Sequence, residues 1–415
     1  MSIRTKIVAA ISAIVVIVAG AVLIAVKPWA GGSDEATITW WVPDWDEAVA
    51  TELVAEFEAE NPDYDVEIVL TTWDTMADKI RVALDAGTAP EVITELTSRV
   101  ARYARADQLT DVTSWYDSSM PTEDFLTSAL EAVTVNGATY AVPFRHDSSV
   151  LLYNREQLAA AGYDEAPQSW DEVVAMSADL TSEAGYAFGW PLGNDNNAVV
   201  RWLEQYLSNG GDLTPAADGS LTIDETAAAA GLTSIAESIQ EGWASQSSLE
   251  LDNTALRDLM ANGKVAMYVG GAYDIAPLQE AGIDVGTAPY PGVGGAGTTT
   301  ADGFSLLVPA DIENTDGAQA LVQFLAQPHN EAALTATFPA RVSAMEDERF
   351  SDPLQQPAID QLMEYSVPLP NHPAWSDMTP AIFAAVQSVV LGDQTAADGA
   401  ASIVAEAERL LGPIE

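Results

Sequence analysis

The sequence predicts an α/β protein built from two packed lobes. Its 415 residues are too many for one ordinary hydrophobic core. Apolar residues make up 48% of the chain and charged residues 19%, a composition typical of a globular protein. Strand and helix patterns alternate from residue 36 onward, and the alternation restarts near Ser149, which favours two α/β lobes.

The first strands and helix of the predicted first lobe follow in order. Residues 36–42, ATITWWV, are apolar and β-rich and predict a buried strand. Residues 46–62 repeat apolar side chains every four positions, which predicts a helix that the Asn61-Pro62 pair ends. Residues 65–72, DVEIVLTT, alternate between apolar and polar side chains and predict a second strand.

A second helix and a third strand complete this pattern. An apolar stripe predicts a helix over residues 72–87, which Gly87 ends. Residues 90–96, PEVITEL, predict the third strand. Such alternation is typical of an open parallel sheet with helical crossovers, which binds ligands in loops beyond the carboxyl ends of its strands.

The second lobe is predicted from segments further along the chain. They are a strand at 149–154, a helix at 169–180, a helix and a buried strand within 254–273, a strand at 304–310, and helices within 379–411. Ser169 and Glu172 have the spacing of a capping box, which predicts where the first of these helices begins. A break near Gly392 divides the last segment into two helices.

A hydrophobic segment precedes the first strand. Residues 7–26 contain no charged side chain and as a helix would span roughly 30 Å, the thickness of a bilayer core. Arg4 and Lys6 come before it, so the remainder of the chain is expected outside the cytoplasm. The alternative is a signal peptide cleaved at Ala19-Gly20-Ala21, followed by secretion. Because the apolar run continues past that box, we favour an uncleaved membrane anchor.

The composition argues against several classes of partner and chemistry. With 62 acidic and 16 basic side chains the net charge is −46, which would repel nucleic acid. The absence of cysteine excludes disulfides, thiolate metal sites, a cysteine nucleophile and an N-terminal lipidated Cys. The glycines at 292–297 lack the Lys-Ser/Thr of a phosphate-binding loop, and the three histidines are far apart. We therefore expect no cofactor, no metal and no catalytic group.

Five segments, taken in order, resemble one known family. They are FEAENPDYDVEI (57–68), APEVITELTSRVARYARADQLTDV (89–112), VNGATYAVPFRHDSSVLLYNREQLAAAGYDEAPQSWDEV (135–173), LMANGKVAMYVGGAY (259–273) and GAQALVQFLAQPHNEAALTATFPARVSA (317–344). Over residues 36–411 the chain resembles the extracellular solute-binding proteins of carbohydrate ABC importers, the maltose-binding-protein-like group (solute-binding family 1). No single segment is diagnostic, but five in the right order are specific.

The resemblance implies a two-lobed periplasmic-binding-protein-like fold (type II) with a sugar cleft between the lobes. It places the anchor and tether at 1–33, the N-terminal lobe at 34–144 plus 303–340, and the C-terminal lobe at 147–300 plus 343–415. It further implies that the part outside the membrane is a monomer and is not an enzyme. This part would capture a di- or oligosaccharide by hinge closure and deliver it to permease subunits. Relatives in Gram-positive bacteria usually carry a lipidated Cys, which this chain lacks, so we expect the hydrophobic helix to tether it to the membrane.

A sugar offers a ring face that stacks on aromatic side chains and a rim of hydroxyls that binds charged and amide groups. Position after strands and the resemblance together yield a set of candidate sugar-binding residues: Asp44, Trp45, Glu95, Arg99, His146, Asp147, Trp190, Asn194, Gly271, Tyr273, Asp302, Arg341 and Trp375. The resemblance implies that Asp147 accepts sugar hydroxyls and that Tyr273 stacks. Successive side chains alternate along a strand, so His146 and Asp147 are not expected to form a catalytic dyad.

Two other functions remain open. A secreted glycoside-active enzyme would need two carboxylates flanking one bond, with one of them protonated. With 62 acidic residues such a pair is available by chance, so their number decides nothing. A membrane-anchored sugar sensor or adhesin could use the same two lobes.

Overall fold

The computed structural model describes residues 36–335 and 337–414. The predicted membrane anchor at residues 7–26 lies outside these residues. Among the helices that are described, none is both long enough and apolar enough to span a bilayer.

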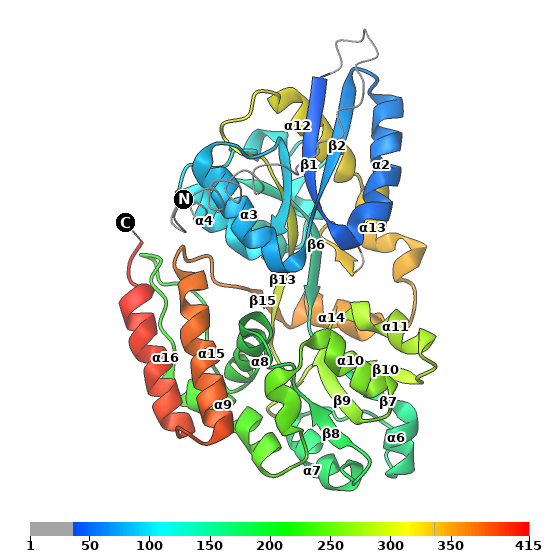
Figure 1. Cartoon of the computed structure of the whole chain (residues 1–415), viewed down its shortest axis with the longest axis vertical. Coiled ribbons are helices and arrows are strands. Elements are labelled where there is room, and N and C mark those ends of the chain that lie inside the picture. The colour runs from blue at the N-terminus through cyan, green and yellow to red at the C-terminus, as the bar shows by residue number, and fades with distance from the viewer. Residues whose placement is uncertain (1–35, 336, 415) are drawn as a thin grey trace, which may run out of the picture. The chain divides into compact units, whose positions relative to one another are not determined.

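The first lobe begins as the sequence predicts. Strands β1 (Ala36–Pro43), β2 (Tyr64–Thr71) and β3 (Val92–Leu96) are linked by helices α2 (Glu47–Glu60) and α3 (Trp73–Ala86), and β1 pairs in parallel with both β2 and β3 (Figure 1). Gly87 has a φ of 62°, the left-handed conformation that ends a helix, so its predicted role is confirmed.

The first sheet is mixed rather than parallel throughout. Four further strands join it, namely β6 (Ala141–Ser148), β13 (Thr299–Leu307), β14 (Phe338–Pro339) and β15 (Ser366–Pro368), in the order β14-β6-β13-β3-β1-β2 with β15 beside β13. Strand β13 is antiparallel to both β3 and β6. The parallel arrangement predicted from the first three strands is confirmed. The sheet as a whole is mixed, because β13 enters it from the second lobe and runs in the opposite direction.

The second lobe is built on a smaller sheet. Strands β7 (Val150–Asn154), β8 (Tyr186–Gly189), β9 (Val265–Gly270) and β10 (Val285–Ala288) lie in the order β10-β7-β9-β8. Ser149 alone separates β6 from β7, so one nearly continuous strand passes from the first sheet to the second (Figure 1). This crossing and that of β13 place side chains at the boundary between the lobes.

Helices surround both sheets. In the first lobe they are α4 (Val100–Arg105), α5 (Thr127–Ala132), α12 (Thr315–Leu325) and α13 (Pro328–Leu334), and in or beside the second they are α6 (Arg155–Ala160), α7 (Trp170–Leu180), α8 (Asp195–Ser208), α9 (Glu225–Gln240), α10 (Asn253–Ala261), α11 (Ile275–Glu280), α14 (Gln356–Glu364), α15 (Trp375–Leu391) and α16 (Ala396–Leu410). Small hairpins are formed by β4 (Thr134–Val135) with β5 (Ala138–Thr139) and by β11 (Pro291–Gly292) with β12 (Gly295–Ala296). The Ser169 cap of α7 and the left-handed Gly392 between α15 and α16 confirm two predicted boundaries.

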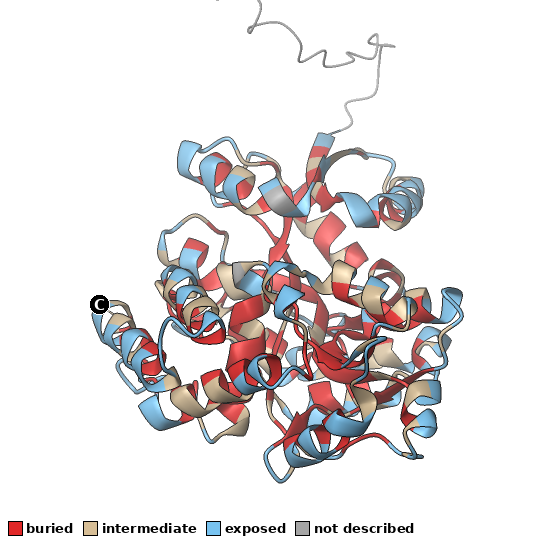
Figure 2. Ribbon diagram, turned by 60° about the horizontal axis from the view of Figure 1, so that its bottom comes forward, coloured by how far each residue is buried: buried red, intermediate tan, exposed pale blue. Residues whose placement is uncertain are grey.

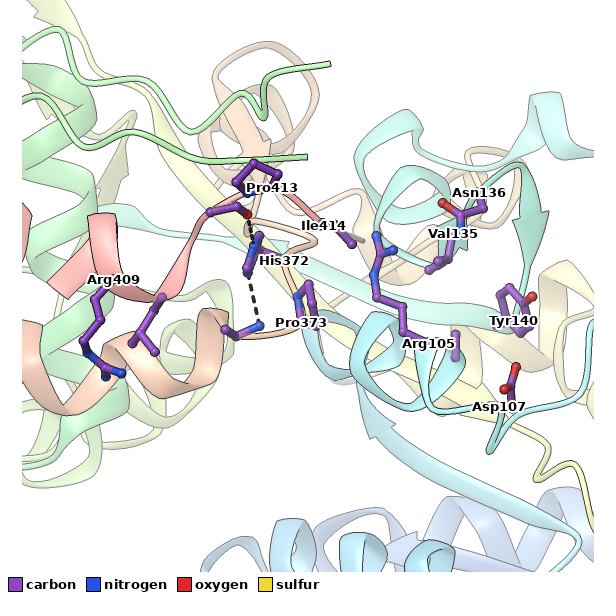
Figure 3. Close-up of a pocket in the computed structure, with 14 residues that line it drawn as sticks. Arg105, Asp107, Val135, Asn136, Tyr140, His372, Pro373, Arg409, Pro413 and Ile414 are labelled. Atoms are coloured by element: carbon purple, nitrogen blue, oxygen red, sulfur yellow. Dashed lines mark hydrogen bonds between the residues drawn. The ribbon is translucent and has the colours of Figure 1, made fainter. Parts of the chain in front are cut away.

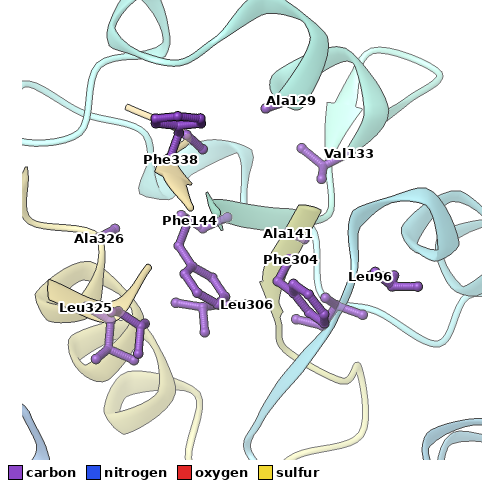
Figure 4. Close-up of a cluster of buried hydrophobic side chains, with 14 of the residues drawn as sticks. Leu96, Ala129, Val133, Ala141, Phe144, Phe304, Leu306, Leu325, Ala326 and Phe338 are labelled. Atoms are coloured by element: carbon purple, nitrogen blue, oxygen red, sulfur yellow. The ribbon is translucent and has the colours of Figure 1, made fainter. Parts of the chain in front are cut away.

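Side-chain alternation divides the hydrophobic interior into two cores. The cross-strand pair Leu151 and Val269 packs into a core with α8, α9, α15 and α16, whereas Leu152 and Tyr268 face the opposite side of the sheet. Buried residues concentrate in the strands and the inner faces of the helices (Figure 2). In the first lobe, Figure 4 shows side chains such as Phe144 and Phe338 clustered between the sheet and its helices.

One stretch expected in the second lobe contacts the first. The Ser343 hydroxyl donates to an Asp124 carboxylate oxygen at 2.6 Å, and the Phe350 ring centroid lies 6.1 Å from that of Phe338. The chain therefore stays with the first lobe for several residues beyond the predicted boundary at 343.

Candidate functional site

The two strands that cross between the lobes carry a pair of carboxylates. Asp147 on β6 and Asp302 on β13 are direct partners in the antiparallel register, so their side chains lie on the same face. Asp302 accepts hydrogen bonds from the backbone N–H of Ser98 at 3.1 Å and from its hydroxyl at 2.6 Å. Ser98 lies in the turn Thr97–Arg99 directly after β3, so the return crossing is fixed to the end of that strand.

The Asp147 carboxyl has an unusual proton affinity. Its pKa is raised to about 6, chiefly by burial and to a smaller extent by the charge of Asp302, while the Thr337 hydroxyl and Arg145 oppose the increase. The side chain is nevertheless partly exposed. At neutral pH it is mainly an anion, and such a carboxylate is an acceptor for hydroxyl groups.

Aromatic rings continue the same face of the crossing strands. Phe304 lies two residues after Asp302, opposite Arg145, and its ring centroid is 6.0 Å from that of Trp45. Trp45 is in turn 6.1 Å from Trp73, centroid to centroid. The two indoles are 44% and 47% exposed, respectively. They follow β1 and β2 directly, so the carboxyl ends of two neighbouring strands present adjacent aromatic surfaces to solvent.

A buried ion pair lies beside the Phe304 and Trp45 rings. The Arg145 guanidinium donates to Asp46 at 2.8 Å and to the Leu334 carbonyl at 2.8 Å. Its central carbon lies 5.3 Å from the Phe304 ring centroid. Both members of the ion pair are about 95% buried, so this contact fixes the turn after β1 that carries Trp45.

The second lobe presents Tyr273 in the turn Ala272–Asp274 that follows β9. Its phenolic oxygen accepts a hydrogen bond from Asn253 Nδ2 at 3.2 Å. Burial, then the carboxylates of Asp274 and Asp147, raise its pKa, although 37% of the residue is exposed. The influence of the Asp147 charge on this pKa indicates that Tyr273 lies near the crossing strands.

Gly271 is needed for this placement of Tyr273. A Cβ atom on Gly271 would lie 2.1 Å from a ring carbon of Tyr273, closer than any van der Waals contact. Gly271 has a φ of −100°, which any residue adopts, so the requirement is space for the ring and not backbone conformation. The sequence predicted Gly271 as a ligand contact, and the structure gives it a positioning role.

Arg201 on α8 connects the two strands that bring these residues together. Its guanidinium donates to Ser149 Oγ at 2.7 Å and to the Val269 carbonyl at 2.9 Å, and forms an ion pair with Glu204 at 3.2 Å. Ser149 is the link between β6 and β7, and Val269 lies near the end of β9. Arg201 therefore fixes the segment after Asp147 to the segment before Tyr273.

Amide side chains extend the polar surface beside Tyr273. Asn253 Nδ2 also donates to Asn197 Oδ1 at 3.3 Å. Asn194, a predicted ligand contact, accepts the backbone N–H of Asn197 at 2.9 Å and so caps the N-terminus of α8. It is partly exposed and its contact with a ligand stays a prediction.

Two predicted contacts in the first lobe are buried instead. Glu95 has no exposed surface: its carboxylate accepts from the Leu96 N–H, from Arg99 and from the Tyr103 hydroxyl. His146 is also fully buried and shares a hydrogen bond of 3.0 Å with Ser128. Both predictions are corrected, because β3 is covered on both faces and His146 lies on the face of β6 opposite Asp147.

Three predicted contacts are structural for other reasons. Trp190 has no exposed surface, packs against Phe188 with centroids 4.7 Å apart, and donates its indole N–H to Ser238. Arg341 is 4% exposed and bonds to Asp124 at 2.8 Å. Trp375 is 5% exposed and begins α15 in the core of the second lobe. Their large side chains complete cores rather than reach solvent.

The remaining predicted residues stay accessible. Asp44 is exposed after β1, and the Arg99 side chain is 29% exposed while paired with Glu95. Sequence reasoning missed Trp73, Ser98, Arg201 and Asn253. Trp73 could have been found, because it follows β2 as Trp45 follows β1. Within the described residues, no group of three or more His, Asp or Glu side chains is arranged to hold a metal ion.

Comparisons with known proteins agree with this architecture. The family model described as bacterial extracellular solute-binding protein matches residues 43–332. The chain is 28% identical over 357 residues to an uncharacterized lipoprotein in the oleD 5′ region of Streptomyces antibioticus, covering 80% of this chain and 74% of that protein. It is 24% identical over 378 residues to the maltodextrin-binding protein MdxE of Bacillus subtilis, covering 85% of each. A solved ABC transporter solute-binding protein from Thermotoga lettingae, bound with α-D-tagatose, superimposes with a TM-score of 0.81 at 20% identity, covering 91% of this chain and all of that one.

Proposed function

Because this chain belongs to the bacterial extracellular solute-binding protein family, we propose that it is the sugar-binding component of an ABC-type importer and that its ligand is a di- or oligosaccharide. The names of the relatives support a carbohydrate ligand, since MdxE is a maltodextrin-binding protein. The observation that carries the proposal is the pair of exposed indoles beside the Asp147–Asp302 carboxylates. Flat apolar rings next to hydroxyl acceptors match the two surfaces of a sugar.

Each side of the site has a proposed role. Trp45 and Trp73 stack on sugar rings from the first lobe, and Asp147 and Asp302 accept hydroxyl hydrogens at the crossing strands. Tyr273 contacts the sugar from the second lobe when the lobes close. The hinge is the break at Ser149 together with β13, since these crossings join the two sheets. Sugar favours the closed form because only that form makes contacts from both lobes.

We further propose that the sugar leaves unaltered. In a glycosidase the two carboxyl groups lie on either side of the scissile bond, about 5–9.5 Å apart. Asp147 and Asp302 lie on one face of neighbouring strands rather than on opposite walls of the site, and Asp302 already accepts two hydrogen bonds from Ser98. Incubation with maltotriose and similar oligosaccharides tests this assignment: we expect binding without new reducing ends, and turnover would refute it.

The chain is proposed to work outside the cytoplasm, held to the membrane by residues 7–26, as a monomer beside its permease subunits. The Streptomyces relative is a lipoprotein, but this chain has no cysteine to carry a lipid. Cell fractionation tests the tether. The full chain should stay with membranes after a high-salt wash, and a chain lacking residues 1–33 but given a cleavable signal should be released to the medium. Release of both chains to the medium would contradict the membrane tether but not the proposed sugar binding.

Ligand titration tests the binding function directly. Tryptophan fluorescence of residues 34–415 should change on adding the correct sugar and report a dissociation constant, because Trp45 and Trp73 would lose solvent contact. Trp45→Ala should weaken that binding. If no mono- or oligosaccharide in a broad panel binds the folded protein, the proposal fails.

A further inference from the structure

A cavity lies away from the proposed sugar site. It has a volume of about 640 Å³ and lies between α4 and the β4–β5 turn on one side, and residues 372–374 with the segment after α16 on the other (Figure 3). Its lining includes Arg105, Val135, Tyr140, Pro373, Leu410 and Ile414. None of the residues of the proposed sugar site lines it. The walls come from both lobes, since α4 packs into the first core and Trp375 into the second.

Hydrogen bonds hold the walls in place. His372 donates from Nε2 to the Gly412 carbonyl at 3.1 Å, and its Nδ1 accepts the Ala374 N–H at 3.1 Å. Asn371 donates to the Thr134 carbonyl at 3.1 Å, which links this segment to the β4–β5 hairpin. The cavity is therefore a built feature, and the imidazole is occupied in forming it.

Arg105 enters this cavity without a partner among the described residues. Figure 3 shows its side chain rising from α4 into the space between Ile414 and the Val135–Asn136 turn. The residue is half-buried, and its Nε atom is inaccessible to solvent and makes no hydrogen bond. Asp107 also lines the cavity, but no carboxylate of the described residues lies within 4 Å of the Arg105 guanidinium.

The other arginines show that this is exceptional. Every other described arginine that is buried or half-buried has an acidic partner: Arg99 with Glu95, Arg145 with Asp46, Arg201 with Glu204, Arg257 with Asp274 and Arg341 with Asp124. In a chain with 62 acidic side chains, a partner for one more arginine is readily available. A partly desolvated guanidinium left unpaired is costly, and an anionic ligand would remove that cost.

We propose that this cavity binds a small organic carboxylate. The planar Arg105 guanidinium suits a two-oxygen anion, which it can hold by two parallel hydrogen bonds. Pro373, Leu410 and Ile414 offer apolar surface for the carbon skeleton. The cavity shares no residue with the proposed sugar site, so the carboxylate site is independent of the proposed transport function.

If the protein also binds sugar as proposed, the two sites should be coupled. Because the cavity has walls in both lobes, a bound carboxylate favours one relative orientation of the lobes. Carboxylate and sugar would then change each other's affinity by the same factor. A titration of sugar with and without saturating carboxylate measures that factor.

Calorimetric titration of residues 34–415 with acetate, benzoate, succinate and inorganic phosphate tests the carboxylate site without sugar. We expect at least one carboxylate to bind the wild type, and Arg105→Gln to weaken it by at least about tenfold, as expected for a charge-assisted pair. Arg102→Gln is the matched control. Arg102 is exposed on the same helix, and its substitution removes the same charge without changing the cavity lining. Arg105→Lys should bind with intermediate strength, because it keeps the charge and loses the two-donor geometry.

Several results would overturn the proposal. The first is a wild type that binds no carboxylate. The second is an equal loss of affinity in Arg105→Gln and Arg102→Gln, and the third is binding of phosphate alone. Thermal unfolding of each variant must stay two-state and near the wild-type temperature, and Arg105→Lys provides the measurement if Arg105→Gln does not fold.

Discussion

Substituting Gly271 by alanine isolates the contribution of the Tyr273 ring. The new Cβ atom would lie 2.1 Å from a ring carbon, so the ring must leave its position, while the backbone tolerates alanine at a φ of −100°. Moving the ring abolishes its proposed stacking on sugar, an interaction of about 0.5–1.5 kcal/mol. We therefore expect sugar affinity to fall roughly two- to tenfold.

Thermal stability should change little in this variant. The ring is already 37% exposed, so its displacement opens no core cavity, and alanine restricts the unfolded chain, which stabilises by roughly 0.4–1 kcal/mol. Gly303→Ala is the contrasting control. There a Cβ would lie 1.8 Å from the Arg145 carbonyl oxygen, so the backbone of β6 or β13 must move and the unfolding temperature should drop sharply.

A double-mutant cycle with Tyr273→Ala decides whether the ring is responsible. The three atoms nearest to the added methyl all belong to the Tyr273 ring. Once the ring is absent, Gly271→Ala should therefore cause no further loss of affinity in the Tyr273→Ala background. The assay is tryptophan-fluorescence titration with the best-binding oligosaccharide. The positioning role of Gly271 is refuted if Gly271→Ala leaves sugar affinity unchanged, or if its effect is the same with and without the Tyr273 ring.

Three further results are expected. Trp45→Ala should weaken sugar binding with little change in unfolding temperature, whereas Trp190→Ala should lower the free energy of unfolding by about 3–5 kcal/mol, because only Trp190 is fully buried; chemical denaturation compares the two. Sugar affinity should fall as pH drops through about 6, the raised pKa of Asp147, and Asp147→Asn should flatten that profile. The raised pKa means that the folded state binds this proton more tightly than the unfolded state, so the contribution of Asp147 to stability is present in acid and is lost as pH rises through about 6. Thermal unfolding measured at each pH separates a loss of affinity from unfolding caused by other groups. Arg201→Met should destabilise by about 3–5 kcal/mol, since it leaves the buried Glu204 charge without its partner, and Arg201→Met with Glu204→Gln should recover part of that loss in the same denaturation assay.

Local sequence patterns predicted the secondary structure well because they depend on neighbours in the chain. The capping box at Ser169, the stops at Gly87 and Gly392, and the alternation after residue 36 all correspond to observed boundaries. The direction of β13 did not follow from such patterns, because strand pairing joins segments about 200 residues apart.

The candidate site, too, was predictable only where the signal is local in the sequence. Position after a strand identified Trp45, and the resemblance identified Asp147 and Tyr273, which the structure brings to one region. Sequence could not separate these from Trp190 and Trp375, whose indoles are chemically identical but fully or almost fully buried. Burial depends on which helices cover a surface, and that is decided by packing between distant segments.

Periodicity along the chain predicted the alternating strands and helices of the first lobe, and the five ordered segments indicated the family. Both kinds of signal depend on residues that are close together in the sequence. Packing between distant segments places Glu95, His146 and Arg341 in the interior. It also leaves Arg105 in a cavity with no acidic partner among the described residues. Hydrogen-bond partners and solvent exposure arise from contacts between residues far apart in sequence, so they exist only once the chain has folded.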